Sequence, residues 1–201
     1  MITAEVRRLY EMLWYPGRTM HASWWRSLDM EVWQRVYAVS EFCRSQIDEL
    51  IRKRASLCEY SVQAKQGDVA LMLMSPGKRI SSIVVALGIL ATGRSEYLLL
   101  TSYRRELGSH LSERNCDDLL AVSPAKVRPI DDVPEASIVA LCEQLGMRWI
   151  DRDMRDEAAW RGLRLQLPAP DKSRSELGGR QEPVIPQDNV LPSLVRLGRL
   201  L

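Results

Sequence analysis

The sequence predicts an all-α protein, built as a single compact multi-helix domain with a Pro/Gly-rich C-terminal tail and a short terminal helix. Apolar residues recur at spacings of three and four along most of the first 167 residues, as they do on the buried face of a helix. After Leu167 the composition turns to proline, glycine, serine and charge, which buries too little apolar area to offset the cost of ordering. We therefore expect a helical domain at 1–167, a flexible linker at 168–187 and an amphipathic helix at 188–201.

Two helices are predicted in the first quarter of the chain, on either side of a Pro-Gly break. An apolar stripe at helical spacing predicts a first helix over 3–13, and Pro16 and Gly17 end it. A second stripe runs from Trp33 to Ile51 and predicts one long amphipathic helix lying on a core. Its opposite, polar face is predicted to carry Arg35, Glu41, Asp48, Arg52 and Lys53.

Three helices are predicted in the middle of the chain. Ser75 followed by Pro76 is typical of a helix start, and the apolar residues that follow, nearly all round the helix, predict a central helix that ends at Gly93. Two further helices, 95–107 and 112–122, each begin with a serine and are separated by a glycine.

The last part of the domain begins with a connector, "SPAKVRPIDDVP", and a helix capped by Asp132 whose buried stripe runs from Ile138 to Trp149. A polar bridge, Asp151–Glu157, follows. The segment 161–167 alternates leucine with polar residues, so it is either a strand or a last helical turn. We favour helix because no partner strand is evident.

Composition and charge narrow the class of function. The formal net charge is +2 at pH 7, too balanced for the whole chain to be a binder of phosphate backbones. The four cysteines lack the close spacing of zinc ligands and are expected to be buried free thiols. The first thirteen residues carry several charges, unlike a signal peptide, and the most apolar run, Ile80–Leu90, is about half of a membrane span. We expect a cytoplasmic protein with no direct membrane insertion.

No pattern predicts catalysis, and we expect no enzymatic activity, no cofactor and no metal. The two histidines, His21 and His110, lack a nucleophile motif or an orienting partner. Ser75–Arg79 lacks the earlier glycine and the final hydroxyl of a phosphate loop. In Asp151–Glu157, interleaved arginines neutralise the carboxylates, which favours a solvated, salt-bridged face over a metal site.

The most unusual stretch is Leu13–Trp25, which contains three of the six tryptophans. Its rings could plug one end of the helical domain, because large aromatics bury much area and tryptophan needs only one polar partner. Some could instead face outward, because Trp, Tyr and Arg are enriched at binding hot spots. Adjacent residues of a helix point about 100° apart, so Trp24 and Trp25 should not both be fully buried.

Three segments together resemble one family. They are "WYPGRTMHASWW" at 14–25, "LGILATG" with the later "YLLLTSYRREL" between 87 and 107, and "ASIVALCEQLGMRWI" followed by "AWRGLRLQLPAP" between 136 and 170. The chain resembles, over about residues 10 to 175, the sorting-platform protein family of type III secretion systems known as SctK, YscK or OrgA.

The resemblance implies a non-enzymatic cytoplasmic adaptor, peripheral to the inner-membrane secretion apparatus and involved in virulence-related protein transport. Its implied partners are the cytoplasmic domain of the inner-membrane ring protein (SctD type) and the pod protein (SctQ type). From residue type and position, we expect the partner-binding residues to be Tyr15, Arg18, His21, Trp24, Trp25, Arg104 and Arg105.

The alternative hypothesis is a helical nucleic-acid-associated regulatory protein. In it, the helix–turn–helix pattern of Ile80–Leu107 would be the reader, with arginines late in the second helix. Such a helix should expose basic and amide residues, yet this one offers mostly leucine and tyrosine. The sequence therefore favours an adaptor that does not bind nucleic acid.

Overall fold

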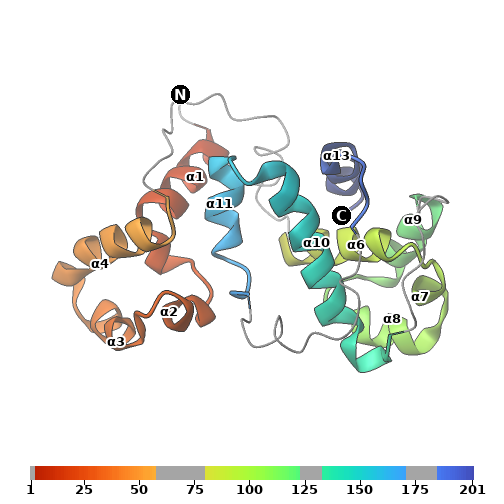
Figure 1. Cartoon of the computed structure of the whole chain (residues 1–201), viewed down its shortest axis with the longest axis horizontal. Coiled ribbons are helices and arrows are strands. Elements are labelled where there is room, and N and C mark those ends of the chain that lie inside the picture. The colour runs from red at the N-terminus through yellow and green to blue at the C-terminus, as the bar shows by residue number, and fades with distance from the viewer. Residues whose placement is uncertain (1–2, 58–79, 123–132, 171–184) are drawn as a thin grey trace. The chain divides into compact units, whose positions relative to one another are not determined.

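The computed structural model describes residues 3–57, 80–122, 133–170 and 185–201, and within these ranges it is all helical, as predicted. The predicted helix start at Ser75–Pro76, the Asp132 cap and most of the predicted linker lie outside the described residues. The helices (Figure 1) are α1 Ala4–Trp14, α2 Ser23–Ser27, α3 Glu31–Val39, α4 Glu41–Arg54, α6 Ile80–Thr92, α7 Glu96–Leu99, α8 Thr101–Leu107, α9 Glu113–Val122, α10 Ile138–Met154, α11 Ala158–Arg164 and α13 Val190–Leu200, with 3-10 turns η1 Pro16–Arg18 and η2 Glu135–Ser137.

The described residues fall into two compact units. Unit 1 contains 3–57 and 156–170, hence α1 to α4 and α11. Unit 2 contains 80–122, 133–155 and 185–201, hence α6 to α10 and α13. The division into these units does not test the predicted boundaries after residues 167 and 187. Those boundaries mark changes of composition along the chain, and they stay predictions.

Unit 1 is built on α1, which packs against both α4 and α11. Thr3 caps α1 through a hydrogen bond from the amide of Val6 to its hydroxyl. The ambiguous segment 161–167 is helical as far as Arg164 and then turns. Gly162 on α11 lies so close to α1 that a Cβ there would be 3.2 Å from Met12 Cβ. The core of the unit consists mainly of Leu9, Met12, Leu13, Trp25, Met30, Ile47, Ile51, Trp160 and Leu163.

The single long helix predicted around residues 33–53 is wrong, because it is two helices separated at Ser40. Ser40 has an extended backbone (φ −111°, ψ 105°), and its hydroxyl accepts a hydrogen bond from the amide of Cys43, so it caps α4. Arg44 reaches back to donate to the carbonyls of Tyr37 and Ala38, which would otherwise be unpaired at the end of α3. The prediction that Asp48 lies on the polar face is also wrong, since this residue is only 2% exposed.

Unit 2 is centred on the predicted central helix α6, which is buried along almost its whole length and crosses α10 (Figure 1). Two glycines make the crossing. A Cβ on Gly88 would lie 1.9 Å from the carbonyl oxygen of Cys142, and a Cβ on Gly146 would lie 2.0 Å from that of Val84. Because each glycine meets the other helix's backbone, the two helices approach more closely than side chains would permit.

Two other predicted helices of unit 2 also need correction. The helix predicted over 95–107 is interrupted at Leu100, whose extended backbone separates α7 from α8. The helix α10 continues to Met154, so the first half of the predicted polar bridge is helical. The terminal helix α13, predicted as amphipathic, packs on α6 and α10 and buries Val190, Leu194 and Leu197.

Candidate functional site: an aromatic–arginine surface

Five side chains of unit 1 form a continuous, partly exposed row that we call the aromatic–arginine cluster: Arg52, Trp14, Tyr10, Tyr15 and Arg18. The rings of Tyr10 and Trp14 stack with centroids 5.6 Å apart, and Tyr15 meets Tyr10 edge-on at 6.2 Å. The guanidinium carbon of Arg52 lies 3.9 Å from the Trp14 ring centroid, and that of Arg18 lies 4.8 Å from the Tyr15 centroid. These distances are those of cation–π contacts.

Helix geometry and a tight turn assemble the row. Tyr10 and Trp14 are four residues apart on α1, so they lie on one face of the helix. The helix ends at Trp14, and the η1 turn over a buried Pro16 directs Arg18 back toward Tyr15. Trp14 is 41% exposed and Tyr10 is 44% exposed, so about two fifths of each side chain is open to a partner.

A buried carboxylate attaches this turn to α4. Asp48 Oδ1 accepts a hydrogen bond of 2.9 Å from the amide of Gly17, and both carboxylate oxygens accept from the Tyr37 hydroxyl at 3.2 Å. A Cβ on Gly17 would lie 2.7 Å from the Tyr37 ring, so the close approach requires glycine. Asp48 and Arg52 are one turn apart on α4, and the same helix therefore anchors the turn and covers Trp14.

The electrostatics of this anchor follow from its burial. Burial raises the pKa of Asp48, while the Gly17 amide, the Tyr37 hydroxyl and the charges of Arg18 and Arg44 oppose the shift. Burial, and after it the charge of Asp48, raise the pKa of Tyr37 to about 12, so its hydroxyl remains a donor at neutral pH. The anchor is a structural group whose hydrogen bonds all lie inside the unit.

The predicted residues His21 and Trp24 belong to a different contact of unit 1. The Trp24 indole N–H donates to the carbonyl of Leu167 at 2.8 Å, and the guanidinium carbon of Arg164 lies 5.3 Å from its ring centroid. The His21 amide donates to the carbonyl of Leu165 at 2.7 Å. The segments "WYPGRTMHASWW" and "AWRGLRLQLP", singled out separately in the sequence, thus pack on each other.

The His21 side chain is exposed, and its Nδ1 lies 2.8 Å from the Ser23 hydroxyl. That hydroxyl in turn accepts a hydrogen bond of 2.9 Å from the amide of Ala169. Ser23 therefore joins the tryptophan segment to the chain that follows α11, and His21 orients its hydroxyl.

The remaining predicted residues are not members of the cluster. Trp25 is 5% exposed and packs against Tyr37 in the core of unit 1, with ring centroids 5.5 Å apart. Arg104 lies in unit 2, where it binds the carbonyl of Leu98 and, at 2.6 Å, the carboxylate of Asp117. Arg105, also on α8, is exposed. Tyr15 and Arg18 are thus the predicted residues that the structure brings together.

Sequence reasoning missed three members of the cluster. Tyr10 was placed in the apolar stripe of the first helix, and Trp14 was considered both as a buried plug and as an outward-facing ring, although their spacing of four did place both on one helix face. Arg52 was predicted only as part of the polar face of the long helix. No sequence signal connects Arg52 to Trp14, because the contact depends on the packing of α4 against α1.

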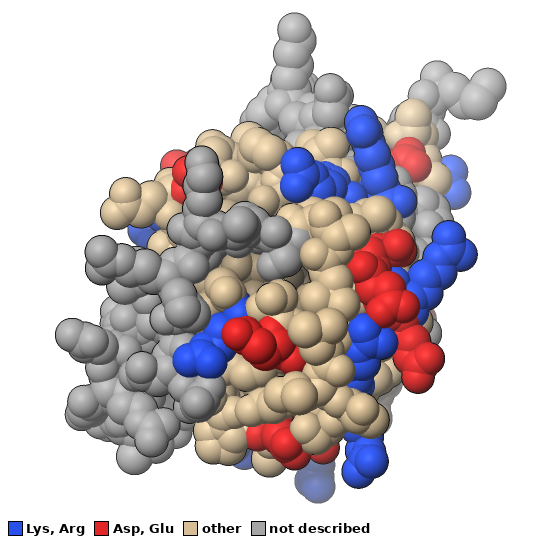
Figure 2. All heavy atoms as spheres, turned by 90° about the vertical axis from the view of Figure 1, so that its right-hand side faces the viewer, with Lys and Arg blue, Asp and Glu red and all other residues tan. Residues whose placement is uncertain are grey.

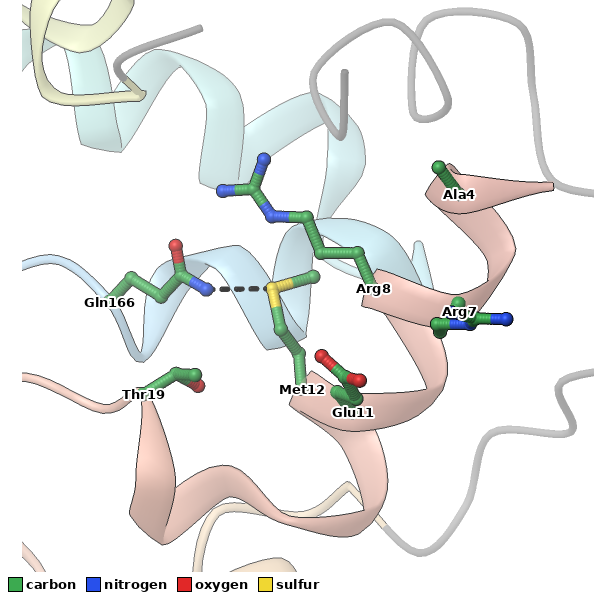
Figure 3. A pocket seen from close by; sticks show the side chains of 7 residues that line it. All are labelled: Ala4, Arg7, Arg8, Glu11, Met12, Thr19 and Gln166. Carbon is green, nitrogen blue, oxygen red and sulfur yellow. Dashed lines mark hydrogen bonds between the residues drawn. The ribbon is translucent and has the colours of Figure 1, made fainter. Parts of the chain in front are cut away.

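Beside the cluster, α1 borders an open hollow of about 580 Å³ (Figure 3). Its lining combines charged and apolar groups, and within it Gln166 Nε2 donates to Met12 Sδ at 2.8 Å. The lining residues are Ala4, Arg7, Arg8, Glu11, Met12, Thr19 and Gln166. An open hollow of this kind suits a protruding side chain of another protein better than an enclosed small molecule.

A second exposed area of unit 1 lies on α3 and the start of α4, where Val32 is 77% exposed and Val39 and Phe42 are each 84% exposed. Val32 and Val39 are seven residues apart and share one helix face. Within α3 only Tyr37 is buried, so this helix spends most of its apolar residues on the surface.

The nucleic-acid reader considered for Ile80–Leu107 finds little support in this geometry. The first of its two helices, α6, is buried in unit 2, and the second is split at Leu100. Arg104 is paired with Asp117. On the face that Figure 2 shows, basic and acidic side chains are interspersed among uncharged ones, whereas phosphate binding needs a basic stripe.

Two other types of site are absent from the described ranges. There, no group of three or more His, Cys, Asp or Glu residues is placed to hold a metal ion, and no helix has the length and apolar character that crossing a bilayer requires. Cys116 and Cys142 are buried free thiols, and burial raises the pKa of Cys142 to about 12, so it stays protonated and unreactive at neutral pH.

Comparison with known proteins identifies one family. The model of a family described as type III secretion system subunit matches residues 7–169, which include both segments that meet around Trp24 and all five residues of the aromatic–arginine cluster. No curated protein and no solved structure matches the chain.

Proposed function

The chain belongs to the type III secretion system subunit family, and from this premise we propose that it is a non-enzymatic cytoplasmic adaptor of the sorting platform. In this role it links the cytoplasmic domain of the inner-membrane ring protein (SctD type) to the pod protein (SctQ type), as the resemblance to the SctK, YscK or OrgA proteins implies. The observation that carries the proposal is the aromatic–arginine cluster on a matched, all-helical chain.

The chemistry of the cluster supports docking. Tryptophan, tyrosine and arginine are enriched among the residues that carry most of the binding energy of protein interfaces, and the two aromatic residues bury large areas at a small entropic cost. Here the rings are already ordered by stacking and by Arg52 and Arg18, so little side-chain entropy remains to be lost on binding. The guanidinium groups add hydrogen-bond donors, which suit carboxylates and carbonyls of a partner.

The proposed function requires only binding. An interface of modest area suits a subunit that must dissociate and be replaced by another copy. A partner that covers the cluster and the adjoining hollow would meet apolar rings at the centre and charged groups at the rim. This is the usual arrangement of non-obligate interfaces. We propose that the cluster contacts one of the two partners, and the following experiment identifies which one.

The test replaces Trp14 with Ala and measures the affinity for the ring-protein domain and for the pod protein separately. Trp33→Ala is the matched control, since Trp33 is also 41% exposed but lies on α3 outside the cluster. Loss of a hot-spot side chain typically costs at least 2 kcal/mol, so we expect Trp14→Ala to weaken one partner by about thirtyfold, with that partner's affinity for Trp33→Ala unchanged.

Thermal melting of both variants separates binding from folding. If Trp14→Ala melts like the original protein and still binds both partners with full affinity, the cluster is not a docking surface and the proposal loses its main support. Trp24→Ala serves as a second comparison, because its indole bond to Leu167 predicts a loss of stability rather than a selective loss of one partner.

A further inference from the structure

A second recognition feature lies in unit 2, on the face of α6 and α10 that α13 covers. Three apolar side chains of α13, spaced by four and three residues, are buried on this face: Val190, Leu194 and Leu197. Arg196 and Arg199 lie on its exposed side. The arrangement is that of an amphipathic helix bound to an apolar surface.

Three side chains of α10 hold the chain where it enters α13. The Trp149 indole N–H donates to the carbonyl of Asp188 at 3.0 Å, and Arg152 donates to the same carbonyl at 2.7 Å and also to that of Pro186. Asp153 Oδ2 accepts the amide of Val190 at 2.7 Å. We call Trp149, Arg152 and Asp153 the α10 clamp.

The hydrogen bonds from the clamp to the segment that enters α13 all join main-chain atoms of that segment. Two carbonyls and one amide of the segment 186–190 are bound, and none of its side chains takes part in these hydrogen bonds. Asp153 and Arg152 also bind each other at 2.6 and 2.8 Å, and this contact is the first cause that lowers the pKa of Asp153. The clamp is thus ordered by its own ion pair and binds the backbone of the segment in one conformation. The buried apolar residues of α13 supply the selectivity for sequence.

The contact between α13 and its support differs from the one between α6 and α10. The latter two meet backbone to backbone at Gly88 and Gly146, inside the range 7–169 that the family model matches. In contrast, α13 lies beyond that range, and the sequence between 168 and 187 has the composition of a linker. The supporting face therefore belongs to the matched region of the chain, and its occupant does not.

From this arrangement we propose that the face of α6 and α10, together with the α10 clamp, is a helix-docking site, and that its occupant is a reversibly bound segment, residues 185–201 of the same chain. The segment leaves and returns as a unit while the rest of unit 2 stays folded. The inference does not depend on the proposed adaptor function, since it concerns a contact within the chain.

The tether decides how such a site behaves. A segment tethered to its site through a short stretch of chain faces that site at an effective concentration in the millimolar range, so a free peptide of the same sequence competes poorly with it. An untethered copy should bind once the tether is cut. The site therefore behaves as closed in the intact chain and as open in the cleaved one.

The first test is amide hydrogen exchange in the intact protein. We expect amides in the middle of α13 to exchange at least about tenfold faster than those at the crossing of α6 and α10, since a local opening needs less free energy than global unfolding. Asp153→Asn should accelerate exchange in α13 alone, and Asp156→Asn, an exposed aspartate outside the clamp, should not. Equal protection of α13 and of the crossing would overturn the proposal.

The second test cuts the tether. A specific protease site is placed in the predicted linker of the full chain, and a fluorescent peptide of residues 185–201 is added before and after cleavage. We expect the peptide to bind the cleaved protein at least about tenfold more tightly than the intact one. A peptide with Leu194→Asp should fail to bind, and one with Arg196→Glu, altered on the exposed side, should bind as the original does.

Two results of the cleavage experiment would sink the idea. In one, the cut segment remains bound and never exchanges with the labelled peptide, which would make α13 a permanent part of the core. In the other, the Leu194→Asp peptide binds as well as the original, which would place the binding elsewhere. Neither result bears on Trp14→Ala and partner affinity, so the two proposals fail separately.

Discussion

The two units differ in where their large apolar residues lie, at the surface or in the core. Seven of the ten large apolar side chains that are exposed in the described residues belong to unit 1, among them Trp14, Val39 and Phe42. In unit 2, α6 buries nearly every residue, and its crossing with α10 leaves room for no side chain at two glycines. Unit 2 is organised around a dense core, whereas unit 1 keeps a large share of its rings at the surface.

The difference shows which unit is suited to meet other proteins. Exposed apolar side chains cost solubility and add little stability, so their gathering in unit 1 indicates interaction surfaces. The interior of unit 1 relies in part on polar groups, notably the hydrogen bonds of Asp48 to Gly17 and Tyr37. Unit 2 should consequently respond most to changes in volume, and unit 1 to changes in polar pairing.

The largest effect is expected in unit 2, from Gly146→Ala. The new Cβ would lie 2.0 Å from the carbonyl oxygen of Val84, which is backbone and cannot turn aside, so α6 and α10 must separate. Overpacking usually costs about 1–3 kcal/mol, and here we expect at least the upper end of that range in the free energy of unfolding. Denaturant unfolding measures it.

Gly108→Ala is the control for this change. Gly108 is exposed at the end of α8, and a Cβ there would come no closer than 3.2 Å to any other atom outside its neighbours. We expect a change within about 0.5 kcal/mol. If the two alanine variants were equally stable, the close packing inferred for the crossing of α6 and α10, on which the description of unit 2 rests, would not hold.

The next effect belongs to unit 1. Asp48→Ala leaves the Gly17 amide and the Tyr37 hydroxyl without their acceptor in a buried place, and each unsatisfied group costs about 1–3 kcal/mol. We therefore expect a loss of about 2–4 kcal/mol. Glu49→Ala, which removes an exposed ion pair with Lys53 on the same helix, should leave the free energy of unfolding nearly unchanged, because solvent screens such a pair.

The cost of Asp48→Ala should also depend on pH. Burial raises the pKa of Asp48 above its ordinary value, so between the two values the folded protein holds a proton that the unfolded chain has released. The free energy of unfolding of the original protein then falls as pH rises through this window, and that of the variant lacks this fall. The difference between the two proteins should be larger near pH 4 than at neutral pH, and a difference that grows with pH would contradict the assignment.

The smallest effect concerns the surface of unit 1. The contact of Arg52 with Trp14 should contribute about 0.5–1 kcal/mol, the usual worth of a cation–π pair near the surface. A double-mutant cycle with Arg52→Met and Trp14→Leu measures this coupling. The same cycle with Trp33→Leu in place of Trp14→Leu should give a coupling near zero. Equal couplings in the two cycles would show that Arg52 does not act through its contact with Trp14.

Local patterns were informative where neighbours along the chain decide the structure. The apolar periodicity predicted α1, the nearly all-apolar α6 and the amphipathic α13. The breaks at Ser40 and Leu100 were missed, since apolar residues keep the helical spacing across both sites. In the first case, Ser40 prefers to cap α4 and Arg44 closes the end of α3, and this pairing outweighs continuity of the helix.

In the candidate site, too, some features were predicted from local sequence and others were not. Tyr15 and Arg18 were predicted from residue type, and the spacing of Tyr10 and Trp14 is legible in the sequence. The role of Asp48 was not predicted, because the local pattern indicates a solvent-exposed carboxylate. Its hydrogen-bond partners, Gly17 and Tyr37, come from other segments. The clamp of α13 was hidden for the same reason, inside a charged stretch interpreted as a solvated face.

The amino-acid order alone determined that this protein is helical and where most helices lie, because these properties depend on residues within one or two turns of each other. Only the tertiary structure decided which rings are buried, which arginine covers which ring and what α13 rests on. Those outcomes depend on the approach of segments distant in sequence, and the free energy of such contacts is set by burial and geometry that no local pattern contains.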